Sequence, residues 1–507
     1  FARRAPSRGT FMPEETSAVQ AFYDQVTNVS DFIWGGTWNG VSVLPFPPMV
    51  IALLGVGLWM MIGLRFYPIL NLGPAFVGLF KSEKTADAEG DGKKGEISPF
   101  AALSTALSGQ VGTGNLAGVA TAITLGGPGA LFWMWITALI GMALAFAEGS
   151  LAIRFREQGP DGEYRGGPMT YIRRGLGKKW GWLAVLFCVG TLFSSVTTGN
   201  MIQANSVADS INGLTGMPEW VAGLIVAAAV FAVIIGGIKS IGAIAEKIVP
   251  TMALAYITMA IVALIMNFED LPGAFATIFE SAFTGHAAAG GFVGAGMIVA
   301  IRAGVARGLF SNEAGQGSTA IGHAVAQTDD PARQGRFAMM GTFIDTIIIC
   351  TATGLVLLTV QGAFPATGAD GVTVMQEHAW SSDLNGFAMT EAAYAAAFPL
   401  QVFGFSIGAL IASLALILFV FTTLITWSYY GERATTHLFG QKMAIPFRLV
   451  WVVMIFIGSF QEITFVWRMG DIANASMALP NLVALALLSG VVFKLARGDK
   501  KAGADHD

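Results

Sequence analysis

Eleven stretches of this chain are long and apolar enough to cross a lipid bilayer as helices. A spanning helix needs about 20 mostly apolar residues, and a helix satisfies its own backbone polar groups, as lipid requires. Only 12% of the 507 residues are charged, against about 25% in soluble domains. We therefore predict an all-α polytopic membrane protein with eleven transmembrane helices, near residues 48–70, 99–123, 127–154, 180–208, 219–238, 246–267, 292–325, 336–361, 398–430, 443–465 and 470–496.

Composition argues against several other classes of protein. The formal net charge of −4 gives no sign of a basic face for nucleic acid. Both cysteines, Cys188 and Cys350, lie in apolar runs, and the five histidines are scattered, so neither a disulfide framework nor a metal cluster is expected. Glycines 112, 114 and 118 only weakly resemble a phosphate loop, because neither a strand nor a Gly-Lys-Ser/Thr sequence accompanies them. We predict a protein that is not an enzyme and has no organic cofactor.

The distribution of positive charge predicts the topology. When the first helix runs from outside to inside, most of the 29 Lys and Arg residues fall in inner loops or the C-terminal tail. The outer side keeps Arg3, Arg4, Arg8 and Arg468. The prediction is a multi-pass plasma-membrane protein, in a bacterium an inner-membrane one, with its N terminus outside and its C terminus in the cytoplasm. The outer N-terminal tail and the first residue, Phe1, also predict a removed signal peptide.

Residues 108–115 form the first place that a membrane helix should not tolerate. Three glycines occur within six residues, each costing about 1 kcal/mol relative to Ala in a helix. Unwound backbone at membrane depth is tolerated where it lines a cavity or is buried in protein. A close helix crossing through small residues is the alternative, but Gln110 and Asn115 add polar groups that such packing does not need.

Residues 307–318 form the second such place, with charges and amides beside the glycines. An ionisable residue inside a membrane is a functional hypothesis by default. The alternative for Arg307 and Glu313 is that they neutralise each other or approach the inner interface.

The two breaks lie five helices apart, which predicts two five-helix inverted repeats that each open with a discontinuous helix. A half-helix N terminus offers free N–H groups and a positive dipole end to a carboxylate. The predicted organisation is an outer N-terminal tail (1–47), an extra helix with a basic cytoplasmic loop (48–98), a first repeat (99–267), an outer loop (268–291), a second repeat (292–496) and a cytoplasmic tail (497–507).

The run GGPGALFWMWITALIG at 126–141 closely resembles the signature of the alanine or glycine:cation symporter family. The sequences TGNLAGVA at 113–120 and RGLFSNEAGQG at 307–317 are similar to that family as well. The resemblance covers about residues 48–496. It implies import of a small neutral amino acid, alanine or glycine, coupled to sodium or sometimes to protons. It also implies the fold of the sodium-coupled neurotransmitter-type transporters, preceded by one extra helix.

The resemblance places the substrate carboxylate at the backbone of Thr113, Gly114 and Asn115. Gln110 becomes a polar contact of the substrate, and Gln203 becomes a partner of its ammonium group. For both glutamines the alternative is a structural hydrogen bond from the side-chain amide to another helix, worth about 0.6 kcal/mol on average.

Sodium, in the same resemblance, binds the carbonyls of Ser108 and Val111 and the hydroxyls of Thr422 and Thr423. The alternative for these hydroxyls is a bond back to carbonyls of their own helix. Phe310 and Trp427 would wall the substrate pocket and limit it to small side chains, with ordinary packing as the alternative.

Two acidic residues have no single interpretation. Asp345, inside the eighth apolar run, fits a second cation site, a proton site or a structural hydrogen-bonding role. Glu148 resembles an end-of-helix family residue, and we expect it at the inner interface. The leading prediction is a secondary active transporter that works by alternating access. A proton-coupled transporter and an ion channel are the alternatives.

Overall fold

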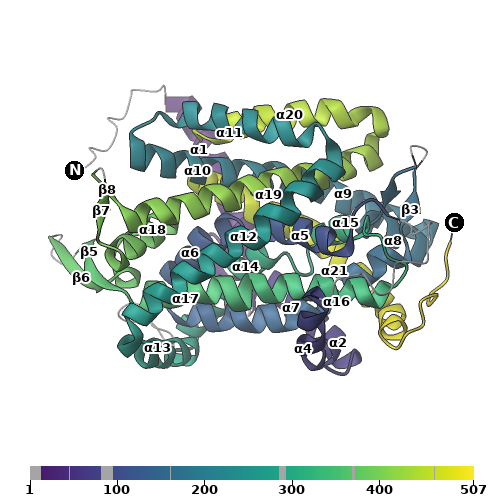
Figure 1. Ribbon diagram of the computed structural model, residues 1–507, viewed down its shortest axis with the longest axis horizontal. Helices are drawn as coiled ribbons and strands as arrows, with labels where there is room; N and C mark the ends of the chain where they lie inside the picture. The colour runs from purple at the N-terminus through teal and green to yellow at the C-terminus, as the bar shows by residue number, and fades with distance from the viewer. Residues whose placement is uncertain are drawn as a thin grey trace.

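The computed structural model describes residues 13–44, 46–80, 95–159, 162–284, 293–367, 372–402, 404–461 and 463–506. Long helices lie side by side along the longest axis of the molecule (Figure 1). The hairpins β5–β6 and β7–β8 and the helix α18 lie at one end of this axis. The helix α8 and the strand β3 lie at the other end (Figure 1).

Among the described residues, four helices precede the segment predicted as the first repeat: α1 (Pro13–Gly35), α2 (Pro48–Gly63), α3 (Tyr67–Leu70) and α4 (Leu72–Phe80). The segment predicted as the first repeat contains α5 (Pro99–Gln110), η2 (Gly114–Gly118), α6 (Val119–Gly126), α7 (Gly129–Arg154), α8 (Pro168–Leu176), α9 (Gly181–Val196), η4 (Thr197–Met201), α10 (Ile202–Thr215), α11 (Glu219–Ile234) and α12 (Gly237–Met266).

After α13 (Leu271–Thr284), the segment predicted as the second repeat contains α14 (Val293–Asn312), α15 (Ser318–His323), α16 (Pro331–Thr342), η6 (Phe343–Cys350), α17 (Thr351–Thr359), α18 (Gly386–Ala397), α19 (Ile407–Phe439), α20 (Ala444–Gly458) and α21 (Ile463–Ala496). In the described part of the chain, four antiparallel hairpins join helices: β1 (Thr37–Trp38) with β2 (Val41–Ser42), β3 (Glu157–Gln158) with β4 (Tyr164–Arg165), β5 (Gln361–Thr367) with β6 (Thr373–His378), and β7 (Gln401–Val402) with β8 (Phe405–Ser406).

The predicted helical membrane fold is confirmed. Each of the eleven apolar runs is occupied mainly by helix. Within the described residues, seven helical stretches are long and apolar enough by themselves to cross a membrane, and α2, α11 and the η2–α6 segment are shorter apolar helices. Large apolar side chains also face outward, such as Leu254 and Ile265 on α12, 67% and 65% exposed. Lipid, rather than water, suits such a surface.

The structure differs from the sequence prediction mainly at the ends of the helices. The run expected at 398–430 begins its helix only at Ile407, because the preceding residues form the β7–β8 hairpin, with Gly404 at a φ of 82° in the turn. The expected outer loop contains α13, and the expected N-terminal tail contains α1. Most of the predicted basic loop, residues 81–94, lies outside the described residues.

Residues that favour helix initiation stand at the start of α5 and α16, two helices next to the breaks. Ser98 accepts a hydrogen bond from the amide of Ala101 at 3.0 Å, and Pro99 occupies the first turn of α5. Asp330 and Pro331 do the same for α16, with the amide of Arg333 as donor at 3.1 Å. Capping side chains and an early proline both favour a helix start.

The two broken helices pack against each other. α14 contacts α6 and η2, and α15 contacts α5. The breaks therefore lie side by side inside the bundle, as the repeat interpretation requires.

Candidate functional site

The first break frees two backbone carbonyls. α5 ends at Gln110, and Val111 adopts an extended conformation, with φ −78° and ψ 97°. The amide of Gly112 would donate to the Ser108 carbonyl in a continuous helix, but it donates instead to Oδ1 of Asn115 at 2.9 Å. The carbonyls of Ser108 and Val111 are consequently available to other partners.

These carbonyls converge on one hydroxyl of α19. Oγ1 of Thr423 lies 3.1 Å from the Ser108 oxygen, 3.2 Å from the Val111 oxygen and 3.0 Å from the oxygen of Phe419. A hydroxyl has one proton to donate, so it can satisfy only one of the three carbonyls at a time. The result is a buried cluster of hard oxygen atoms, the ligand type that alkali and alkaline-earth cations prefer.

The neighbouring hydroxyls of α19 differ in their partners. The Thr422 hydroxyl donates to the Phe419 oxygen at 2.9 Å and lies 3.7 Å from the sulfur of Met252. The Thr426 hydroxyl is paired with the hydroxyl of Ser108. The structure thus brings Ser108, Val111 and Thr423 together, while Thr422 shares only the Phe419 carbonyl with them. Sequence reasoning missed Phe419 and Thr426, although their spacing of three or four residues from Thr423 puts them on the same helix face.

Gln203 and Thr113 meet at the other side of the first break. The amide and the hydroxyl of Thr113 both donate to Oε1 of Gln203, at 3.1 and 2.8 Å. Nε2 of Gln203 donates to the carbonyl of Thr198 at 3.2 Å. Both Thr113 and Gln203 are buried. An acceptor oxygen is therefore held where the resemblance places one oxygen of a carboxylate.

Gly114 adjoins this position and leaves no room for a side chain. A Cβ atom there would lie 2.9 Å from the ring of Phe310 and 3.1 Å from the backbone of Ser311. The first break therefore touches the end of α14 directly.

Gln110 connects the two breaks. Its Nε2 donates to the carbonyl of Asn312, the last residue of α14, at 2.5 Å. Its Oε1 has no hydrogen-bond partner within the described part of the chain.

The second break is a tight turn between α14 and α15. Glu313 has a φ of 55°, and Gly315 and Gly317 both have φ of 87°, the left-handed region that glycine adopts without strain. The Glu313 carboxylate accepts from the Ser318 hydroxyl at 2.5 Å and from Nε1 of Trp427 at 2.8 Å. The same indole N–H lies 3.3 Å from the carbonyl of Gly109. Trp427 therefore contacts both breaks.

Glu148 of α7 contacts the second break and is buried inside the protein, so the expectation that it faces the inner interface was wrong. Its side chain is fully buried. It accepts from the amide of Gly317 at 3.0 Å and from Nδ2 of Asn481 at 2.7 Å. The amide at the start of α15 needs an acceptor, and a buried carboxylate supplies it.

Arg307 pairs with α21. Its Nη2 lies 2.7 and 2.8 Å from the two carboxylate oxygens of Asp471. The guanidinium also lies over the ring of Trp467 at 4.7 Å, and that ring packs on Phe310 with 4.7 Å between centroids. The alternative that Arg307 and Glu313 neutralise each other is therefore wrong.

Asp345 is fully buried between the two broken helices. It accepts from Nδ2 of Asn115 at 2.6 Å and from the hydroxyls of Ser311 and Thr346 at 2.8 and 2.7 Å. Asn115 and Asp345 both belong to π-helical segments, η2 and η6. Such segments occur often at functional sites.

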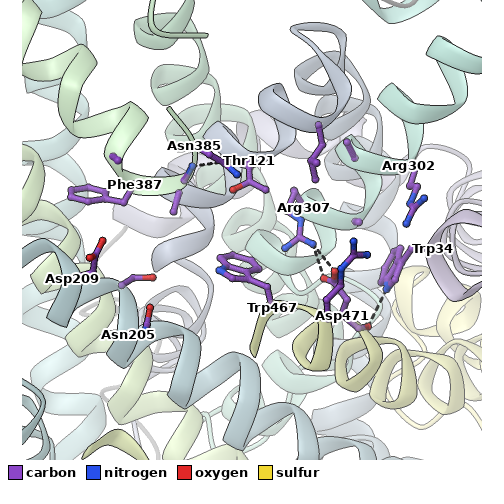
Figure 2. A pocket seen from close by; sticks show the side chains of 18 of the residues that line it. Trp34, Thr121, Asn205, Asp209, Arg302, Arg307, Asn385, Phe387, Trp467 and Asp471 are labelled. Atoms are coloured by element: carbon purple, nitrogen blue, oxygen red, sulfur yellow. Dashed lines mark hydrogen bonds and ion pairs between the residues drawn. The ribbon is translucent and has the colours of Figure 1, made fainter. Parts of the chain in front are cut away.

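A cavity of about 720 Å³ leads toward the breaks from one end of the molecule. Figure 2 shows Trp467 and the Arg307–Asp471 pair among its lining residues. Phe387 of α18 and Asn385, the residue that caps the start of this helix, line it as well, and α18 lies at the end with the β5–β8 hairpins (Figure 1).

Backbone pairing joins the opposite ends of the two broken helices. The amide of Glu96 donates to the carbonyl of Val325 at 2.7 Å, and that of Gln327 to the carbonyl of Ile97 at 2.8 Å. Arg156 adds hydrogen bonds to the carbonyls of Ala324 and Ala326 at 3.2 and 2.6 Å. The breaks are thus approached by a cavity on one side and covered by paired backbone on the other.

The chain is similar to known transporters over nearly its whole length. Residues 29–504 match the sodium:alanine symporter family. The sodium/alanine symporter AgcS of Methanococcus maripaludis is 42% identical over 478 residues, which cover 93% of this chain and 96% of the relative. The probable sodium/glutamine symporter GlnT of Bacillus subtilis is 35% identical over 461 residues, covering 90% of this chain and 89% of GlnT.

The fold is similar to a solved transporter structure, MhsT in complex with L-phenylalanine. The TM-score is 0.53 at 14% sequence identity, and the match covers 80% of this chain and 90% of MhsT. The chain belongs to the sodium:alanine symporter family and is a multi-pass, sodium-coupled amino-acid transporter.

Proposed function

We propose that this transporter imports a small neutral amino acid, alanine or glycine, together with sodium. The observation that carries the proposal is the adjacency of two sites on one break: the oxygen cluster around Thr423 and the donor pair of Thr113. Sodium and substrate would bind on either side of the same unwound turn. The occupancy of one would then affect the other through residues 111–113.

The substrate carboxylate, in this proposal, takes the place of Gln203 Oε1 at Thr113. The amide and hydroxyl that now donate to the glutamine would donate to the carboxylate, an acceptor of charge-assisted and therefore stronger hydrogen bonds. The released Gln203 oxygen could then accept from the substrate ammonium. Gly114 and Asn115 complete the unwound turn that faces the carboxylate.

Sodium would be held by the carbonyl oxygens of Ser108, Val111 and Phe419 and by the hydroxyl of Thr423. The hydroxyl proton can bond to only one carbonyl oxygen, whereas the cation would contact all four oxygen atoms at once. Thr422 joins the site only if its side chain turns from the position in which it contacts Met252.

Two aromatic rings support a limit on substrate size. Phe310 lies against Gly114, and the ring of Trp427 lies against the backbone of Gly199. The N–H of Trp427 is also fixed by Glu313 at 2.8 Å. These fixed rings favour alanine or glycine over a longer side chain such as that of glutamine.

During alternating access, the cavity at one end would close and the paired backbone at the opposite end would open. The cavity end would face the outside, with the N terminus outside and the C terminus in the cytoplasm, in a plasma membrane that is the inner membrane in a bacterium. Inward opening would separate the paired segments at Ile97 and Ala326 and release both ligands to the cytoplasm.

Uptake by proteoliposomes tests the function. We expect an inward sodium gradient to drive accumulation of labelled alanine, with competition by unlabelled glycine and weak competition by glutamine. Potassium replaces sodium in the control. Accumulation driven equally by a proton gradient without sodium would favour the proton-coupled alternative, and a sodium current independent of substrate would favour the channel.

A further inference from the structure

The N-terminal helix α1 contributes Asp31 and Trp34 to the lining of the cavity and precedes the two predicted repeats in the chain. Asp31, near its end, sits between two arginines from different helices. Its Oδ1 lies 2.5 Å from Nη2 of Arg302 on α14 and 2.8 Å from Nη1 of Arg468 on α21. The carboxylate therefore bridges a broken helix and the last helix of the second repeat.

A second contact of α1 reaches the ion pair deeper in the cavity. Nε1 of Trp34, a buried residue, donates to the backbone carbonyl of Asp471 at 3.0 Å. The side chain of the same Asp471 binds Arg307. Figure 2 shows Trp34 beside Asp471, on the opposite side of it from Trp467.

Two layers of contacts thus join α14 to α21 at this end. The inner layer is the direct Arg307–Asp471 pair, and the outer layer is the Arg302–Asp31–Arg468 bridge. Without Asp31, the outer layer would place two like charges in proximity and would repel. Whether α14 and α21 attract or repel each other in this outer layer therefore depends on Asp31 of α1.

An aromatic contact holds α1 against α21 as well. The ring of Tyr23 packs on Phe465 with 4.5 Å between centroids, and Phe22 contacts the same ring at 6.0 Å. The helix is thereby fixed to α21 at two places along its length, and Asp31 extends from it toward α14.

We propose that α1 is a component of the outer closure of this transporter, in which Asp31 and Trp34 are positioning residues. Asp31 ties α14 to α21, and Trp34 sets the position of Asp471 for Arg307. Loss of Asp31 shifts the protein toward conformations in which the cavity is wider open. The assignment of this end as the outer one rests on the proposed function, whereas the contacts themselves do not.

Accessibility of a cysteine in the cavity tests the proposal. Thr121→Cys places a thiol on α6 among the lining residues, while the native Cys188 and Cys350 are buried. The purified full-length protein in nanodiscs, without sodium or amino acid, is treated with a charged methanethiosulfonate reagent. The parent protein without Thr121→Cys gives the background rate.

Asp31→Asn should raise the rate of thiol modification about two- to fivefold, the range expected for losing partly exposed ion pairs. Asp24→Asn on the same helix is the matched control, because its carboxylate interacts with Gln20 of α1 itself, and it should leave the rate unchanged. Replacing Arg302 and Arg468 by Gln in the Asp31→Asn protein removes the repulsion and should bring the rate back down.

Trp34→Phe keeps a ring and removes the hydrogen bond to Asp471, so it should also raise the rate. This variant decides the question if Asp31→Asn fails to fold by size-exclusion chromatography. Rates equal to wild type for both variants would overturn the proposal, as would an equal increase from Asp24→Asn. The measurement needs no transport, so a failure of the proposed function would leave its result unaffected.

Discussion

The hydroxyl of Thr423 lies 3.1 Å from the carbonyl oxygen of Ser108, although 315 positions separate the two residues in the chain. Its neighbour Thr422 directs its hydroxyl to the Phe419 carbonyl and toward Met252. Adjacent residues of an α-helix point about 100° apart, because a turn takes about 3.6 residues. The two threonines of the pair are therefore not equivalent at the break.

Thr423→Val should weaken sodium activation about tenfold or more, because valine keeps the shape and removes the oxygen that faces the carbonyls. Thr422→Val is the matched control and should have a much smaller effect. The measurement is the sodium concentration that gives half-maximal alanine uptake by proteoliposomes. An equal shift in both variants would contradict the separate roles, and no shift in either would remove both from the ion site.

Gly114→Ala should weaken substrate binding by about fivefold or more, because overpacking a tight site typically costs about 1–3 kcal/mol. The added methyl group would lie 2.9 Å from the ring of Phe310. Gly118→Ala in the same π-helical segment is the control, because a Cβ atom there meets only the Thr113 carbonyl, at 3.9 Å. Binding of labelled alanine at fixed sodium concentration measures the effect. Normal binding to the Gly114→Ala protein would show that this side of the break does not receive substrate.

Sequence alone located both breaks but not all of their partners. Glycines that interrupt an apolar run are a local signal, so residues 108–115 and 307–318 could be recognised without a structure. The pairing of Arg307 with Asp471 joins residues 164 positions apart, and no local pattern selects that aspartate over Glu313. The burial of Glu148 likewise depends on which face of α7 meets α15.

The sodium site was predicted through a resemblance, and its four predicted residues do not all lie together in the structure. Ser108, Val111 and Thr423 come together, but the hydroxyl of Thr422 points toward Met252 of α12, because neighbouring residues of α19 face different helices. The contacts of α1 could not be predicted at all. Its contacts through Asp31 and Trp34 reach helices that begin hundreds of residues later.

Glu148→Ala should destabilise the protein markedly, since it leaves the amide of Gly317 without its buried acceptor and removes one of the two acceptors of the Asn481 amide group, the other being the carbonyl of Gly315. Each buried donor left unsatisfied costs about 1–3 kcal/mol. Glu148→Gln keeps one acceptor oxygen and should be milder, and Glu280→Ala on the exposed side of α13 should be neutral. The midpoint of thermal unfolding in detergent measures all three. A wild-type midpoint for Glu148→Ala would mean that α15 does not depend on this carboxylate.

A disulfide across the paired backbone should hold together the ends of the broken helices that lie opposite the cavity. Ile97 and Ala326 face each other in a parallel bridge, a spacing compatible with the Cα separation of about 4.4–6.8 Å that a disulfide allows. The double variant Ile97→Cys, Ala326→Cys should lose alanine uptake on oxidation and recover it on reduction. Its sodium-dependent binding of alanine should persist throughout, because the cavity at the other end still leads to the site. Each single cysteine variant serves as a control and should be insensitive to oxidant. Full uptake by the oxidised, cross-linked protein would show that this end does not have to separate during transport.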